Sequence, residues 1–160
     1  MNFFEDSQTA EDGTTHDVVE ADVLIDASLE AVWALVSEPG WWINDGPLGD
    51  HEVSLGDDGL YRVADPEAGD WLVEKSDSDP MDVATFRWYP LAGDEFPEDA
   101  ATRVEVSLSE EHGKVAVHVE ESGLSAVSDD EDVAYTAWED ASGMWDEALA
   151  SARRYLENRS

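Results

Sequence analysis

The chain has 160 residues, of which 40 are acidic and eight are basic, so its formal net charge is −32. Such a charge repels phosphate, which argues against nucleic-acid binding and against attraction to anionic membranes. Hydrophobic residues still make up 42% of the sequence and include seven tryptophans, so we expect one folded domain with a sizeable core.

Cysteine is absent, which excludes disulfides, thiolate nucleophiles and cysteine-ligated zinc. Residues 1–16 lack a basic segment followed by an apolar run, so we interpret them as a flexible acidic leader before a single domain, 17–158. No apolar run approaches the length of about 18 residues that a membrane span requires, and a cytoplasmic protein is expected. Only two bases are lysines, a composition that suits either a salt-rich cytosol or an acidic mesophilic proteome.

The chain begins its expected structure with a strand and a short helix. In 18–26, apolar residues alternate with acidic ones, which predicts a half-buried strand. Ser28 is a good cap for a helix with apolar residues on one side, and Pro39-Gly40 would end it. Trp41 and Trp42 follow directly, in a bend.

Six further short strands are expected between residues 51 and 121, separated by turn sequences and polar loops. Alternating apolar residues and turn residues predict them at 51–55, 60–64, 71–75, 82–89, 102–108 and 115–120. Residues 76–80 are interpreted as a polar loop, and 110–113 as a tight hairpin turn. Strands joined by hairpins form an antiparallel sheet with one apolar face.

Residues 129–158 predict one long amphipathic helix, because apolar or small residues recur with a four-three spacing. Trp138, Trp145 and Tyr155 alternate with alanines on that stripe. Alanines fill little volume, so this face either meets another surface closely or leaves a void. We therefore expect an α+β fold in which a curved antiparallel sheet of about six to seven strands wraps around the long C-terminal helix, with a short helix after the first strand.

Several motifs stand in a characteristic order along 17–158: Ala27 to Trp33, Trp41-Trp42, Trp71-Leu72-Val73-Glu74, Phe86-Arg87-Trp88, Glu121-Ser122-Gly123-Leu124 and Trp138 to Leu156. Their order resembles the helix-grip fold of the SRPBCC superfamily, which includes START-like and birch-pollen-allergen-like proteins. Within it, the chain looks most like the single-domain relatives of the activator of the heat-shock protein 90 ATPase. The resemblance implies the fold, but not one function, because the superfamily contains carriers, cyclases, hydrolases and chaperone partners.

Catalytic and metal-binding patterns are weak. The four histidines form no H-x-x-x-H or H-E-x-x-H pattern, and His118 alternates with valines, so it should point away from the helix or lie at a strand end. Asp77, Asp79 and Asp82 lack the glycine and glutamate of a calcium loop. No nucleophile elbow, phosphate loop or dinucleotide fingerprint is present. We expect no metal and no cofactor, and nothing in the sequence argues for an enzyme.

The aromatic residues favour a binding function. Large rings on a sheet that faces alanines are typical of an apolar pocket, although a packed core remains the alternative. The candidate cavity residues are Trp71, Phe86, Trp88, Val104, Val106, Val117, Trp138, Ala141, Met144, Trp145 and Ala148.

The sequence allows two interpretations of Arg87. Alternation places it on the face opposite Phe86 and Trp88, where it would pair with a carboxylate. Alternatively, it is a cation at the pocket rim that orients a ligand carboxylate or hydroxyl.

The functional hypothesis is binding of a small apolar or amphipathic molecule between sheet and helix. One alternative is a protein-interaction module with a chaperone partner, as the family resemblance implies. A third is a cyclase or hydrolase that acts in the same cavity.

Overall fold

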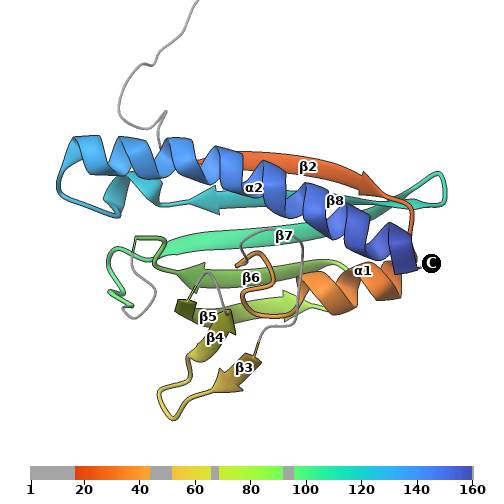
Figure 1. Ribbon diagram of the computed structural model, residues 1–160, viewed down its shortest axis with the longest axis horizontal. Helices are drawn as coiled ribbons and strands as arrows, with labels where there is room; N and C mark the ends of the chain where they lie inside the picture. Colours follow the sequence, from red (N-terminus) through yellow and green to blue (C-terminus); the bar gives the residue numbers. More distant parts are fainter. Residues whose placement is uncertain (1–16, 44–51, 66–68, 92–95, 160) are drawn as a thin grey trace, which may run out of the picture.

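The structure is a computed structural model that describes residues 17–43, 52–65, 69–91 and 96–159. A seven-stranded antiparallel sheet carries one long helix across its inner face, and a short helix lies near the C-terminal end of the long one (Figure 1). The elements in chain order are β2 (Val19–Ile25), α1 (Leu29–Val36), β3 (Glu52–Leu55), β4 (Tyr61–Asp65), β5 (Gly69–Asp79), β6 (Val83–Trp88), β7 (Thr102–Glu111), β8 (Lys114–Ser122), η3 (Leu124–Ala126) and α2 (Glu131–Arg159). This is the α+β helix-grip architecture that the sequence predicts.

The strand order is β2-β8-β7-β6-β5-β4-β3, so the first strand pairs with the last and the other neighbours follow the chain. His112 and Gly113 form a two-residue hairpin loop between the paired residues Glu111 and Lys114. Both loop residues have positive φ, 54° and 83°, as a turn that matches the strand twist requires. The hairpin predicted at 110–113 is therefore present, and it is tighter than four residues.

Residues 76–80 do not form the predicted loop, since β5 continues to Asp79 and pairs with Val83 of β6. The register shifts between Lys75 and Asp77, which marks a bulge at Ser76. The second half of β5 is exposed on both sides, so its sequence carries no apolar alternation. Pairing with β6, rather than burial, makes this segment a strand.

The turn after α1 brings two indoles into the core. Ser28 caps α1, since its Oγ accepts a hydrogen bond from the Ala31 N–H at 3.1 Å. Gly40 then adopts a φ of 75° against β4, where a Cβ atom would lie 2.5 Å from Val63 Cγ2. Only glycine fits so close an approach with this backbone. Trp41 and Trp42 enter the interior directly after it.

A cluster of aromatic rings lies in the interior between sheet and α2. Trp41, Trp42, Phe86 and Trp145 are all at most 2% exposed. The Trp42 ring lies 5.3 Å from the Trp145 ring, 5.4 Å from Phe86 and 5.4 Å from Trp88, within the range of favourable aromatic contacts. The small residues of α2 can face the sheet because Trp41, Trp42 and Trp88, which other elements carry, supply volume there.

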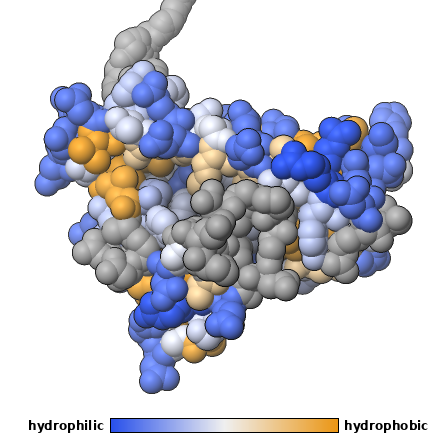
Figure 2. All heavy atoms as spheres, viewed as in Figure 1, coloured by the Kyte–Doolittle hydropathy of each residue, from blue (hydrophilic) through white to orange (hydrophobic). Residues whose placement is uncertain are grey.

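The visible outer surface is mostly hydrophilic along α2, with a group of hydrophobic residues exposed near the end where α2 begins (Figure 2). No helix in the described part of the chain is long and apolar enough to cross a membrane.

Candidate functional site

Among the residues that the structure describes, one acidic side chain is buried in the core, that of Glu121. On β8, Val115, Val117 and Val119 point inward and are at most 1% exposed. Glu121 has the same parity, so it also points inward, and its exposed fraction is 0%. In a molecule with 40 acidic residues, this carboxyl group is exceptional, because acidic side chains are almost never fully buried without partners.

The partners of Glu121 are three donors from three elements. The indole Nε1–H of Trp88, on β6, donates to Oε2 at 2.9 Å, and that of Trp145, on α2, donates to Oε1 at 2.8 Å. The hydroxyl of Thr102, at the start of β7, lies 2.5 Å from Oε2. A carboxyl group suits this place because both its oxygens accept hydrogen bonds, whereas an amide has one accepting oxygen.

Burial raises the pKa of Glu121 above its ordinary value, and the hydrogen bonds from Thr102, Trp145 and Trp88 offset only part of this rise. None of these three donors carries a charge. In the neutral form, Glu121 donates a hydrogen bond to the Thr102 hydroxyl oxygen. The Thr102 hydroxyl then donates a hydrogen bond to the carbonyl oxygen of Trp88, 3.4 Å away. The site can therefore hold a neutral, hydrogen-bonding acid within apolar surroundings.

A pocket of about 110 Å³ lies over this carboxyl group, between the sheet and α2. Its volume is somewhat smaller than an engineered cavity of about 150 Å³ that accommodates benzene. It could therefore receive a small group or one end of a larger molecule. The lining residues are Trp88, Pro90, Leu91, Glu121, Ala137, Asp140, Ala141 and Met144.

The residues that the sequence suggested for a cavity are distributed over three environments. Trp88, Ala141 and Met144 line the pocket. Trp71 and Trp138 are half-buried against the core and are not among the lining residues of the pocket. The Trp71 ring lies 5.3 Å from that of Trp88, and Trp138 Nε1 donates to the Val18 carbonyl at 3.0 Å. The remaining candidates are buried in the packed core, namely Phe86, Val104, Val106, Val117, Trp145 and Ala148.

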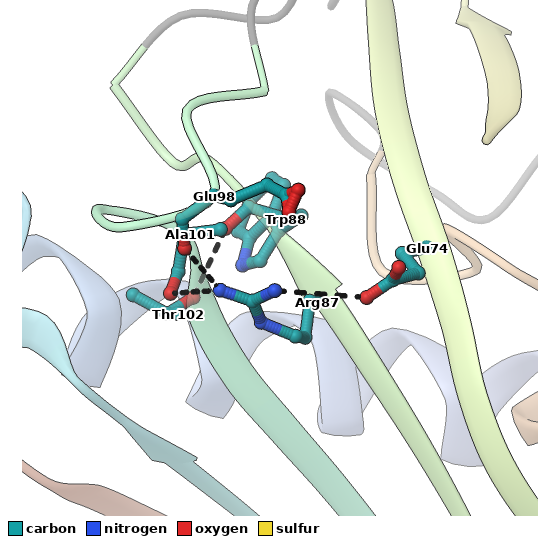
Figure 3. Close-up of polar contacts among 6 residues, drawn as sticks. All are labelled: Glu74, Arg87, Trp88, Glu98, Ala101 and Thr102. Carbon is teal, nitrogen blue, oxygen red and sulfur yellow. Dashed lines mark hydrogen bonds and ion pairs between the residues drawn. The ribbon is translucent and has the colours of Figure 1, made fainter. Parts of the chain in front are cut away.

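Arg87 lies on the other face of β6 from Trp88, as Figure 3 shows. Its guanidinium pairs with Glu74 of β5 at 3.7 Å and donates to the backbone carbonyls of Glu98 and Ala101. It also lies 5.7 Å from the centre of the Phe96 ring. These are the contacts of an outward arginine that holds the segment before β7 against the sheet, and none of them is with a pocket-lining residue.

Sequence reasoning did not select five lining residues: Pro90, Leu91, Glu121, Ala137 and Asp140. A signal for Glu121 was present, because it continues the inward valines of β8 at the same spacing of two. Pro90 and Leu91 come after β6 and carry no periodic signal, so only the folded chain places them beside α2.

Comparison with known proteins gives structural similarity only. No family model matches the chain, and no curated protein matches its sequence. Among solved structures, DynU16, a protein of the dynemicin biosynthetic locus, has a TM-score of 0.63 and 19% identity, covering 88% of this chain and 47% of its own. The chain thus spans about half the length of DynU16.

Two further structures cover most of both chains. The Aha1 dimer from Colwellia psychrerythraea has a TM-score of 0.60 and 16% identity, over 88% of this chain and 96% of its own. CalU16 from Micromonospora echinospora has a TM-score of 0.57 and 16% identity, over 87% and 75%. At such identities the likeness shows the fold alone: the chain shares the helix-grip fold of these structures.

Proposed function

We propose that this protein binds a small apolar or amphipathic molecule in the pocket between sheet and α2. The observation that carries this proposal is the position of Glu121: apolar walls from Trp88, Ala141 and Met144 converge on a buried carboxyl group. Pockets of this kind, mostly apolar with a few converging polar groups, are the usual form of small-molecule sites.

The charges around the pocket favour a neutral or cationic ligand. Glu121 carries no charge in its neutral form, and its oxygens can still accept a hydrogen bond from a ligand hydroxyl at the floor of the pocket. Asp140 lies at the pocket on α2 and is exposed, and the whole chain has a net charge of −32. An anionic ligand would be repelled by both, so a free carboxylate is the least suitable group.

The pocket volume limits how much of a ligand is enclosed. At about 110 Å³, the pocket takes a ring or a chain end, and the rest of a larger molecule would lie outside it. Ligand binding there would bury the apolar surface of Trp88 and Met144, which predicts a negative heat-capacity change.

A second candidate is a chaperone-associated interaction module. The acidic surface and the fold shared with the Aha1 dimer support it. Binding of this kind would weaken steeply with salt, since charge pairing would drive it. A cyclase or hydrolase using the same cavity is a weaker third candidate. Glu121 and Asp140, which both line the pocket, would then be its candidate acid and base.

The proposal is tested by calorimetric titration of a panel of neutral amphipathic molecules, namely sterols, fatty alcohols and aromatic polyketides, at 0.1 M and 1 M KCl. We expect saturable binding with a negative heat-capacity change and little salt dependence. Ala141→Trp should abolish binding because the new ring fills the pocket, at a stability cost of about 1–3 kcal/mol.

Ser142→Trp is the matched control, since Ser142 is the next residue on α2 and is exposed. It adds the same ring without entering the pocket and should bind like the parent. If the parent protein binds none of the panel, but the immobilised protein binds a chaperone and loses it as salt is raised, the second candidate replaces the first. Equal binding by both tryptophan variants would place the ligand elsewhere.

A further inference from the structure

On the outer face of the sheet, a histidine and three carboxylates lie close together on β2 and β8, the first and the last strand along the described chain. Strand pairing sets Glu20 of β2 opposite Glu120 of β8, and Asp22 opposite His118. All four side chains point away from the core, because the inward positions of β8 hold valines and Glu121. Nothing in the linear sequence joins them, since β2 and β8 lie almost 100 residues apart.

The imidazole ring of His118 is held between carboxylates at both nitrogens. Its Nδ1 lies 2.6 Å from Asp22 Oδ1, and its Nε2 lies 3.2 Å from Glu20 Oε1. Glu20, His118 and Glu120 each place one potential ligand atom within 4.8 Å of the other two. The three atoms are close enough to contact one ion after small side-chain rotations.

Asp22 has the position of an outer partner in a metal site. When a carboxylate accepts the Nδ1–H of a histidine, the Nε2 lone pair is left to bind a metal, and ring orientation is fixed. Here that lone pair would face Glu20 and Glu120. The group thus contains both a set of ligands and the hydrogen bond that usually orients the histidine ligand.

The carboxylates on this face favour a nearby positive charge. Glu20 lies opposite Glu120, and Glu120 lies opposite Glu105 of β7, so three glutamates form a row across three strands. Like charges at directly opposite positions destabilise a sheet. Arg103 pairs with Glu105 at 3.2 Å, at one end of the row. The other end, Glu20 with Glu120, has His118 beside it.

We propose that this outer-face group binds one divalent transition-metal ion of the Zn²⁺ class, through His118 Nε2 and the carboxylates of Glu20 and Glu120. Imidazole favours Zn²⁺ over Mg²⁺ and Ca²⁺, which take oxygen ligands only. Glu20 and His118 keep side-chain exposures of 59% and 38%, so water can complete the coordination. The bound ion links β2 to β8, the pair that joins the first strand to the last.

The test is calorimetric titration of the full chain with ZnCl₂ after chelator treatment, in 0.5 M KCl and 5 mM Mg²⁺ to occupy diffuse acidic sites. We expect one tight equivalent. His118→Gln should weaken it at least tenfold. Asp22→Ala should weaken it by about 10–100-fold, because it removes the orienting hydrogen bond. Circular dichroism confirms that each variant is folded.

His112→Asn and Glu111→Gln are the matched controls, at the exposed hairpin that joins β7 to β8, and should bind Zn²⁺ like the parent. Asparagine tolerates the positive φ of His112. Unchanged affinity in His118→Gln, or several weak equivalents that vanish with KCl, would overturn the proposal. Ala141→Trp should keep Zn²⁺ binding, so this site and the ligand pocket succeed or fail separately.

Discussion

The two faces of β8 place neighbouring glutamates, Glu120 and Glu121, in opposite environments. Glu121 points inward, has an exposed fraction of 0% and is held by two indoles and a hydroxyl. Glu120 points outward, opposite Glu20, near His118. The residue type is the same and the positions are adjacent. The parity along the strand decides whether a carboxyl group is a neutral hydrogen-bonding partner or a surface charge.

The pKa shifts on the two faces have different causes. Burial raises the pKa of Glu121, because removal from water disfavours the carboxylate. On the outer face, the hydrogen bond to Asp22 is the largest cause that raises the pKa of His118. Inside, the surroundings disfavour a charge; outside, they favour a positive one. The predictions below change one face at a time.

The largest effect is expected on the inner face, from Trp145→Ala. This indole is fully buried, packs on Trp41 and Trp42 and donates to Glu121. Its loss should lower the free energy of unfolding by about 3–5 kcal/mol in urea titrations. Val133→Ala, at a 39% exposed position of the same helix, should cost less than about 1 kcal/mol. Similar losses in both would show that the aromatic core does not stabilise the fold.

An intermediate, pH-dependent effect is expected from Glu121→Gln. Gln has one accepting oxygen for two indole N–H groups, so at low pH the variant should be less stable by about 1–3 kcal/mol. The folded-state pKa of Glu121 is raised above 4.5, so above that pH native Glu121 holds its proton longer than the unfolded chain does. Parent stability then falls as pH rises from about 4.5 towards the folded-state pKa.

Gln does not titrate, so the stability difference between parent and Glu121→Gln should be largest below pH 4.5 and narrow as pH rises above it. Urea unfolding of both proteins between pH 4 and pH 8 measures this difference directly. A gap that stays constant, or widens with pH, would mean that the buried carboxyl group is ionised in the folded protein.

The smallest effect is expected on the outer face, where each surface charge contributes only a little to the change of Tm with salt. With a net charge of −32, the Tm should rise as KCl increases from 0.01 M to 1 M and the Debye length falls from about 30 Å to about 3 Å. Near neutral pH, Glu120→Gln should reduce this rise slightly, since it removes a charge from the glutamate row. A Tm independent of salt would show that the acidic residues compensate one another locally.

The sequence predicts the elements that carry a strong periodic signal. The four-three spacing of α2 and the alternation of β2, β7 and β8 place these elements to within three residues of their ends. The end of β5 was missed, because its residues are polar and exposed and only pairing with β6 defines them. A segment whose structure depends on its partner has no local pattern to read.

The same limit applies to the sites. Three lining residues of the pocket, Trp88, Ala141 and Met144, could be predicted because large rings and small helix residues on inward faces suggest a space. The place of Glu121 in the pocket depends on two tryptophans, 33 and 24 residues away in sequence, whose indole N–H groups donate hydrogen bonds to its carboxyl group. The outer-face group depends on a strand register that joins Asp22 to a histidine 96 residues later.

By itself, the sequence determined the order of elements, the inward and outward faces of most strands and the amphipathic helix, because each follows from periodicity along the chain. The tertiary structure alone decided that Trp41 and Trp42 fill the space under α2, that a pocket of about 110 Å³ remains over Glu121, and that Glu20 meets His118. These depend on packing volume and strand register, which are set by contacts between residues distant in sequence and leave no local pattern.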